Sequence, residues 1–134
     1  MNDIEEARSS TASSLCLHNI LSKYKILDRN MGEALVLNPS LDSNILELVL
    51  EKCSIELRIL ALKHPNITSD QQFNIISSIK FDHLRTKAKT ILLQRIDLDI
   101  NIIAVLCLDP EIQIRQTALE LLKRRKNDQL LSKI

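Results

Sequence analysis

The side chains that could act as nucleophiles, bases or metal ligands are few and lie far apart in the sequence. The three histidines and three cysteines are His18, His64, His83, Cys16, Cys53 and Cys107. No C-x-x-C occurs, no Cys/His group has the spacing of a zinc site, and no Cys or Ser stands at a nucleophile's motif spacing from a histidine. With Gly32 as the one glycine, a glycine-rich phosphate loop is impossible. We therefore predict a protein that is not an enzyme and that has no catalytic residue, metal or cofactor.

A short sequence pattern that contains an arginine occurs three times in the chain. Residues 57–61, 84–88 and 114–118 share the pattern (Leu/Ile)-Arg-x-x-Ala, and their arginines lie 27 and 30 residues apart. A guanidinium can hold a carboxylate or a phosphate with two hydrogen bonds. These arginines therefore form either a structural ladder or a stripe that contacts an acidic partner or phosphates: Arg58, Arg85 and Arg115. The acids nearest to them in sequence are their candidate partners: Glu56, Asp82 and Glu111.

A second group of cations lies in the C-terminal half, where residues 123–126 carry the most concentrated charge. Cations at a helix C-terminus are stabilised by the helix dipole, so a solvated helix end is one interpretation. A contact with nucleic acid or an acidic protein is the other. The candidate basic patch consists of Lys87, Lys89, Arg95, Lys123, Arg124, Arg125 and Lys126.

Composition predicts the elements that position these residues. The chain has 134 residues, 45% of them hydrophobic, with only one Gly, three Pro and 2% aromatic residues. Scarce turn residues disfavour sandwiches and barrels, so we expect one all-helical domain with an aliphatic core. The polar, acidic N-terminus and the lack of an apolar run near ~20 residues predict a cytoplasmic protein with no membrane contact. Its thiols are expected to be reduced and half-buried.

A second feature repeats upstream of each arginine. An aliphatic residue followed by a helix-capping residue precedes the arginine by 17, 18 and 17 residues, which predicts caps at Asp42, Thr68 and Asp99. Thr68 and Gln71 also have the spacing of a capping box. The first two units begin with Asn38-Pro39 and His64-Pro65, where His64 is interpreted as a turn residue and not as a ligand. The third unit has no proline and is about four residues longer, which lengthens a helix by about one turn.

Each unit is therefore expected to be a helical hairpin, with the (Leu/Ile)-Arg-x-x-Ala motif on its second helix. Apolar residues follow each cap at helical spacing. They are Ile45, Leu46, Val49 and Leu50 in the first unit, Phe73, Ile75, Ile76 and Ile79 in the second, and Ile102, Ile103, Val105 and Leu106 in the third. The motif alanine is small enough to let neighbouring helices approach closely.

We predict a single domain over residues 1–134 that contains three to four hairpins. Its parts are a degenerate N-terminal capping unit at about 12–37, repeats at about 38–61, 65–88 and 96–123, and a short closing helix at about 128–134. In the capping unit Ala34 takes the place of the motif alanine, and Met31 replaces the arginine. Such a departure is typical of a terminal repeat.

Residues 31–123 resemble the HEAT-like helical repeats, and especially the bacterial leucine-rich repeat variant type. The resemblance implies a short right-handed α-solenoid of HEAT/ARM-like hairpins. Some variant-repeat proteins carry an iron–sulfur cluster on an N-terminal cysteine cluster, but Cys16 stands alone here, so no cofactor is expected.

Stacked repeats form an extended, fairly rigid surface that favours binding over chemistry. We therefore expect a non-enzymatic protein-binding module, a small adaptor or an inhibitor of the immunity type, that is a monomer or weak dimer. The alternative is binding to a nucleic-acid backbone through the basic residues of the C-terminal half.

Overall fold

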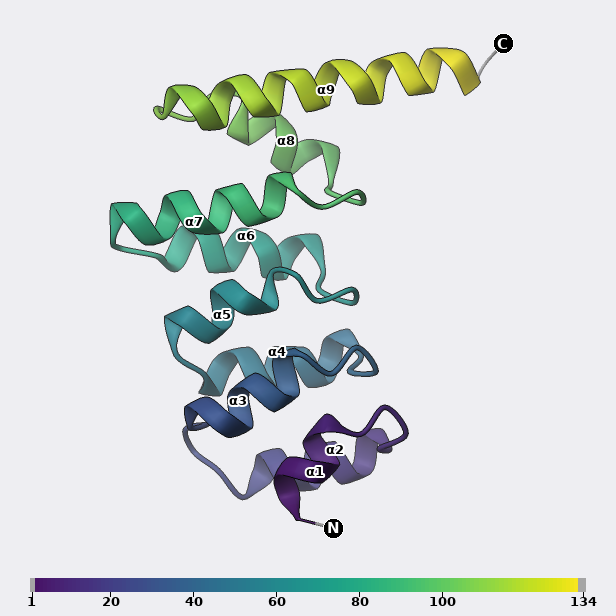
Figure 1. Cartoon of the computed structure of the whole chain (residues 1–134), viewed down its shortest axis with the longest axis vertical. Helices are drawn as coiled ribbons and strands as arrows, with labels where there is room; N and C mark the ends of the chain where they lie inside the picture. Colours follow the sequence, from purple (N-terminus) through teal and green to yellow (C-terminus); the bar gives the residue numbers. More distant parts are fainter. Residues whose placement is uncertain (1, 133–134) are drawn as a thin grey trace. The chain divides into compact units, whose positions relative to one another are not determined.

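The computed structural model describes residues 2–132, with side chains described for residues 2–129, and contains helices but no strand over that range. The helices in chain order are α1 (Asp3–Arg8), α2 (Ser14–Ser22), α3 (Arg29–Val36), α4 (Ser43–Lys52), α5 (Ile55–Ala61), α6 (Ser69–Ser78), α7 (Asp82–Leu93), α8 (Ile100–Leu106) and α9 (Ile112–Ser132). The prediction of an all-α protein is confirmed for the described residues. The helices are labelled in Figure 1.

The chain forms two compact units, an N-terminal unit of Met1–Ile75 and a C-terminal unit of Ile76–Ile134. Helix α6 crosses the boundary between them, so each unit is described by itself. The single domain expected from chain length stays a prediction.

The three predicted caps begin the helices that the sequence assigned to them. Asp42 accepts a hydrogen bond from the Ile45 amide at 2.8 Å, and Asp99 accepts one from the Asn101 amide at 2.7 Å. Thr68 Oγ1 accepts from the Gln71 amide at 3.1 Å, while Gln71 Oε1 accepts from the Thr68 amide at 2.9 Å. This reciprocal pair is a capping box, and it satisfies two amides that a helix start leaves without partners.

The N-terminal unit has two layers of helices. Helix α3 packs against α1 on one side and α5 on the other, while α2 packs against α4 (Figure 1). Leu35 and Leu46 are fully buried between these helices. Gly32 allows a close approach of α3 to α5, because a Cβ at this position would lie 2.4 Å from Leu57 Cδ1.

In the C-terminal unit α9 packs against both α7 and α8. Ala88 of α7 and Ala118 of α9 are completely buried, as is Ala61 in the N-terminal unit. The motif alanine therefore lies in the core in all three repeats, as its small size predicts. Helix α7 is 12 residues long and α5 is seven, so the longer third connection does lengthen a helix.

The structure corrects several expectations about the helices. Helix α9 is continuous from Ile112 to Ser132, so the closing helix predicted at 128–134 is not separate over the described residues, and residues 133–134 lie outside them. Helix α1 was not predicted. Phe73 and Val105, both expected in the core, are 49% and 54% exposed.

Candidate binding surface

Two of the three motif arginines brace the turn of their own hairpin. Arg58 Nε donates to the carbonyl oxygen of Leu50 at 2.9 Å, and Arg115 Nη1 donates to the carbonyl oxygen of Asp109 at 2.9 Å. Both acceptors lie at or just beyond the C-terminal end of the preceding helix, where carbonyls have no intrahelical partner. These contacts favour the structural interpretation of Arg58 and Arg115.

Arg85 differs from the other two. It forms an ion pair with Asp82, in which the arginine side chain is 42% exposed and the aspartate side chain 94%. Among the described residues Asp82 is the one predicted acid that pairs with its arginine. Glu111 instead accepts a hydrogen bond from Thr86 Oγ1 at 2.7 Å.

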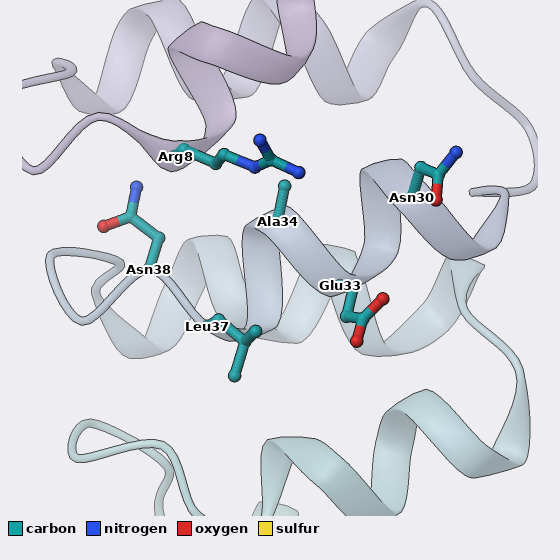
Figure 2. Close-up of a pocket in the computed structure, with 6 residues that line it drawn as sticks. All are labelled: Arg8, Asn30, Glu33, Ala34, Leu37 and Asn38. Atoms are coloured by element: carbon teal, nitrogen blue, oxygen red, sulfur yellow. The ribbon is translucent and has the colours of Figure 1, made fainter.

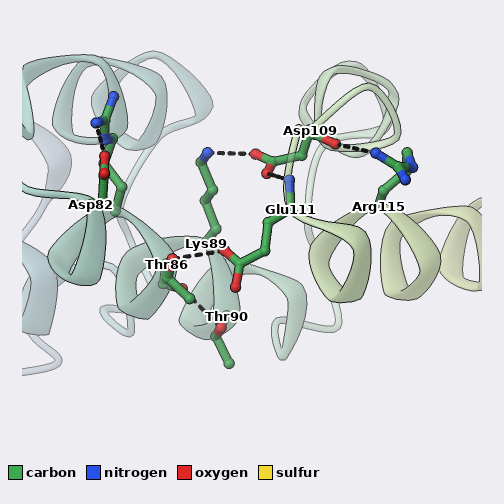
Figure 3. A network of polar contacts seen from close by, with 8 residues as sticks. Asp82, Thr86, Lys89, Thr90, Asp109, Glu111 and Arg115 are labelled. Atoms are coloured by element: carbon green, nitrogen blue, oxygen red, sulfur yellow. Dashed lines mark hydrogen bonds and ion pairs between the residues drawn. The ribbon is translucent and has the colours of Figure 1, made fainter.

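Asp109, in the loop between α8 and α9, is the centre of a polar network (Figure 3). Its carboxylate pairs with the Lys89 ammonium and accepts from the Glu111 amide at 3.0 Å, while its carbonyl accepts from Arg115. The side chains of Asp109 and Lys89 are only 5% and 17% exposed. Because separating a buried pair leaves one charge without compensation, this pair is costly to break. Lys89 is therefore not available to a ligand.

Two further cations of the predicted patch hold the loop between α7 and α8. Arg95 Nε and Nη2 donate to the two carboxylate oxygens of Asp97 at 2.9 and 3.0 Å. These hydrogen bonds hold the pKa of Asp97 below its usual value. From α9, Arg125 Nη1 donates to the Leu98 carbonyl at 2.9 Å and Nη2 to the Ile96 carbonyl at 2.5 Å.

The remaining patch cations are exposed and make no ion pair with the described residues: Lys87, Lys123, Arg124 and Lys126. Three of them flank Arg125 on α9. Because Arg125 contacts the loop that leads into α8, its direct neighbours Arg124 and Lys126 project from α9 on the two sides of this contact, whereas Lys123 lies further round the helix. The predicted patch is thus reduced to a small basic cluster on α9, defined as Lys123, Arg124 and Lys126, and a separate lysine on α7.

The contacts between successive turns come from side chains that the arginine pattern does not include. Asn38 Nδ2 donates to the carbonyls of Ala7 and Ser9 at 2.8 and 2.9 Å. His64 Nε2 lies 2.7 Å from the Asn38 carbonyl, and its Nδ1 accepts from the Asn66 amide at 3.0 Å. Asn38 and His64 are 2% and 3% exposed. His64 is therefore a buried structural residue, as the sequence interpretation held.

Asn66 completes the contact between the two proline-containing turns. Its Nδ2 donates to the Pro39 carbonyl at 3.2 Å and to the Leu41 carbonyl at 2.7 Å. The corresponding two carbonyls of the loop at residues 94–99 are those that Arg125 binds. The sequence signalled the contacts of Asn38 and His64, since both stand directly before a proline, whereas Asn66 follows one.

Two cavities of the described residues have at most two charged lining side chains each. A cavity of about 390 Å³ lies against α3 and is lined by Arg8, Asn30, Glu33, Ala34, Leu37 and Asn38. Figure 2 shows the Arg8 guanidinium lying over Ala34, while Glu33 points away from it. A cavity of about 230 Å³ between α7 and α9 has Glu111 as its one charged lining residue, and this carboxylate is bound to Thr86.

The three cysteines are free and differ in burial. Cys16 is exposed, Cys53 is buried and Cys107 is half-buried, so the expectation of half-buried thiols holds for one of the three. Burial raises the pKa of the Cys53 thiol, which disfavours its reactive thiolate form. Over the described residues no three His, Cys, Asp or Glu side chains come together as metal ligands.

The most unusual surface is the outward side of α8, whose sequence is INIIAVL. Ile102, Ile103 and Leu106 are buried, while the opposite side exposes Ile100, Ala104 and Val105 together with one polar residue, Asn101. We define the α8 apolar face as Ile100, Ala104, Val105 and the adjoining Leu108. At helical spacing these residues share one side, and Val105 and Leu108 are 54% and 84% exposed. A helix side with so few polar residues is normally covered.

The outward side of α4 provides a comparison within the chain. Its exposed residues are Asn44, Glu47 and Glu51, so this side is polar and acidic, as expected for a helix that faces water. The α8 apolar face carries no charged side chain. The sequence pattern contained this information, because six of the seven residues of α8 are apolar, but of the residues on the α8 apolar face only Val105 was considered, and it was assigned to the core.

None of the helices over residues 2–132 combines the length and hydrophobicity that a membrane span requires. No family model, no curated protein and no solved structure matches the chain.

Proposed function

We propose that the protein is a non-enzymatic protein-binding module, a small adaptor or inhibitor, whose partner covers the α8 apolar face. The observation that carries the proposal is the exposure of Val105 and Leu108 at 54% and 84% on a helix without charged residues. Burial of apolar area contributes about 25 cal/mol per Å², and contiguous exposed apolar surface is typical of interaction sites. The free cysteines support a cytoplasmic location, and we expect a monomer or weak dimer before the partner binds.

The proposed scaffold is a short α-solenoid of stacked hairpins related to the HEAT-like repeats. Two kinds of repeated contact support it. The side chains at Asn38 and His64 each reach a carbonyl of the preceding turn, and Asn66 and Arg125 bind corresponding carbonyl pairs. Hairpins that repeat the same contact are the basis of solenoid stacking.

The test compares capture of proteins from the cell of origin by three versions of the purified chain. The wild type is compared with a Val105→Ser/Leu108→Gln variant and with a Leu15→Gln/Leu37→Gln control, in which the changed residues are exposed on the N-terminal unit. Quantitative mass spectrometry is expected to show a protein that the wild type and the control retain and the α8 variant loses. Equal recovery by all three would contradict the proposal.

Nucleic-acid binding remains the second candidate, because four exposed cations make no ion pair with described residues. Neutralising four phosphates predicts that log K falls with log salt with a slope near −3.6, at about −0.9 per phosphate. A filter-binding titration of duplex DNA and RNA against salt measures this slope. Affinity that survives at physiological salt and depends on Lys123, Arg124 and Lys126 would favour this candidate over protein binding.

A further inference from the structure

We propose that the partner presents an acidic amphipathic helix, which lays its apolar side on the α8 apolar face and its carboxylates against the basic cluster on α9. The inference rests on the proposed function and adds the chemistry of the partner. It follows from the position of the basic cluster, from the absence of ion pairs between the cluster and the described residues, and from the shape of the α8 apolar face.

The position of the cluster is set by Arg125. Its two hydrogen bonds, at 2.9 and 2.5 Å, attach α9 to the carbonyls of Leu98 and Ile96, directly before the Asp99 cap of α8. Arg124 and Lys126 are the sequence neighbours of Arg125, so they project from α9 on either side of this contact. Cations and apolar side chains therefore lie next to each other at the N-terminal end of α8, where Ile96 is 95% exposed.

The nearest acids on the loop do not neutralise these cations. The Asp97 carboxylate is held by Arg95 through two hydrogen bonds, and the Asp99 carboxylate accepts from the Asn101 amide as the cap of α8. The C-terminal unit carries eleven Lys and Arg against seven Asp and Glu. A partner that approaches the α8 apolar face thus meets a positive rim, which favours and steers an acidic segment.

The shape of the face favours a helix as the occupant. Ile100, Ala104 and Leu108 recur at intervals of four along α8 and the turn that follows it, and such a ridge fits the i, i+3, i+4 and i+7 anchors of a second helix. A membrane surface would also match apolar and basic groups. However, α8 contains no aromatic residue, and interfacial helices usually bury a longer apolar side.

The inference is tested with two designed helical peptides of about 18 residues. Both carry leucine at i, i+3, i+4 and i+7. In the acidic peptide all charged residues are Glu, and in the matched basic peptide Lys stands at the same positions. Binding to the full chain is measured by fluorescence anisotropy at low and physiological salt, and circular dichroism verifies that both peptides are equally helical.

Two sets of variants separate the apolar and the electrostatic contributions. Lys123→Gln/Arg124→Gln/Lys126→Gln removes the basic cluster, and its matched control is Lys25→Gln/Lys63→Gln/Lys80→Gln, which neutralises three exposed lysines elsewhere. Val105→Ser/Leu108→Gln removes the apolar contact, and Leu15→Gln/Leu37→Gln is its control. We expect the acidic peptide to bind the wild type at least ~10-fold more tightly than the basic peptide. Each test variant should weaken acidic-peptide binding ~10-fold, whereas each control should stay within ~2-fold of the wild type.

Equal affinity for the two peptides, or no binding of the acidic one, would overturn the inference. Binding to anionic phosphatidylserine vesicles that requires Val105 and Leu108, in place of peptide binding, would assign the face to a lipid surface. If the peptides fail while the α8 variant still loses a captured protein, the proposed function stands and only the acidic helix is wrong. If the variant loses no captured protein, the proposed function itself fails.

Discussion

At the scale of single residues, the hydrogen-bond partner of each polar side chain sets its pKa and its contribution to stability. The Tyr24 hydroxyl donates to Asp3 Oδ2 at 2.9 Å, and Lys23 Nζ lies 3.4 Å from Asp3 Oδ1. The hydrogen bond from Tyr24 is the main cause that lowers the pKa of Asp3 below 3.8, and the same bond raises the pKa of Tyr24 above 10.0. These contacts attach α1 to the end of α2 and to the segment that follows it.

The linked titrations predict a pH dependence at both extremes. Because the pKa of Asp3 is lowered in the folded chain, its contribution to stability is complete above the ordinary aspartate value and is lost as pH falls through the folded pKa. Because the pKa of Tyr24 is raised, its contribution is complete below the ordinary tyrosine value and is lost as pH rises through the folded pKa.

This chain has one tyrosine and no tryptophan, so tyrosinate absorbance reports Tyr24 alone. Titration of the wild type should give a pKa above 10.0, and Asp3→Asn should move it towards the ordinary value because the carboxylate acceptor is lost. Glu5→Gln, a charge change on the same helix, serves as the control. Identical titrations in the wild type and Asp3→Asn would contradict the hydrogen bond.

Asn38 gives a second prediction at this scale. Its side chain donates to two carbonyls and accepts from the amide and hydroxyl of Ser40, at 3.1 and 2.7 Å. Asn38→Ala leaves these buried groups unsatisfied and should lower the free energy of unfolding by about 2–3 kcal/mol. Urea denaturation measures the change. Asn30→Ala, at an exposed position on α3, should stay within about 0.5 kcal/mol, and a similar loss in both variants would refute the role of Asn38.

At the scale of secondary-structure elements, the long helix α9 fixes the start of α8. The carbonyls of Ile96 and Leu98, in the loop before α8, accept hydrogen bonds from a side chain of α9. Arg125 supplies the donors that Asn66 supplies to the earlier turn. One guanidinium, with its planar pair of donors, thus binds two carbonyls of the loop before α8.

Arg125→Met tests this interpretation because it retains the aliphatic stem and removes the donors. The free energy of unfolding should fall by about 1–2 kcal/mol, and hydrogen exchange should accelerate in residues 96–100. Lys126→Met removes the neighbouring charge and should leave both quantities unchanged. Equal acceleration in the two variants would show that helix charge, and not the bonds to Ile96 and Leu98, holds the loop.

At the scale of the whole molecule, the described helices differ in what they expose. Adjacent residues of α8 fall in different environments, since Leu106 is 3% exposed and Val105 is 54% exposed. A core side chain stabilises the fold, whereas an exposed apolar side chain contributes little until a partner covers it. The α8 apolar face should therefore be dispensable for folding and needed for binding.

Paired substitutions on α8 measure this difference. Val105→Ser/Leu108→Gln should change the free energy of unfolding by no more than about 0.5 kcal/mol per site, whereas Leu106→Ala should cost about 2–5 kcal/mol. Thermal and urea denaturation provide the two measurements. A large loss in the first variant would place Val105 or Leu108 in the core and remove the basis of the proposed interface.

Much of the local structure could be predicted, since helix caps and apolar periodicity depend on residues a few positions apart. Asp42, Thr68 and Asp99 begin helices because each side chain reaches an amide two or three residues later. The motif alanines were also assigned correctly, because a small residue at a fixed helical position marks a close helix contact. The extra length of α7 followed from counting residues between two such anchors.

The candidate site could be predicted only in part. The sequence by itself determined that cations are concentrated near the C-terminus and that six of the seven residues of α8 are apolar. Only the tertiary structure decided which of these groups stay exposed. Lys89 pairs with Asp109, 20 residues away in sequence, and Arg125 donates to the Leu98 carbonyl, 27 residues away, so both cations have intramolecular partners. Val105, in contrast, lies on a side of α8 that no described helix covers. Such outcomes depend on distances between segments far apart in the chain, which local spacing does not encode.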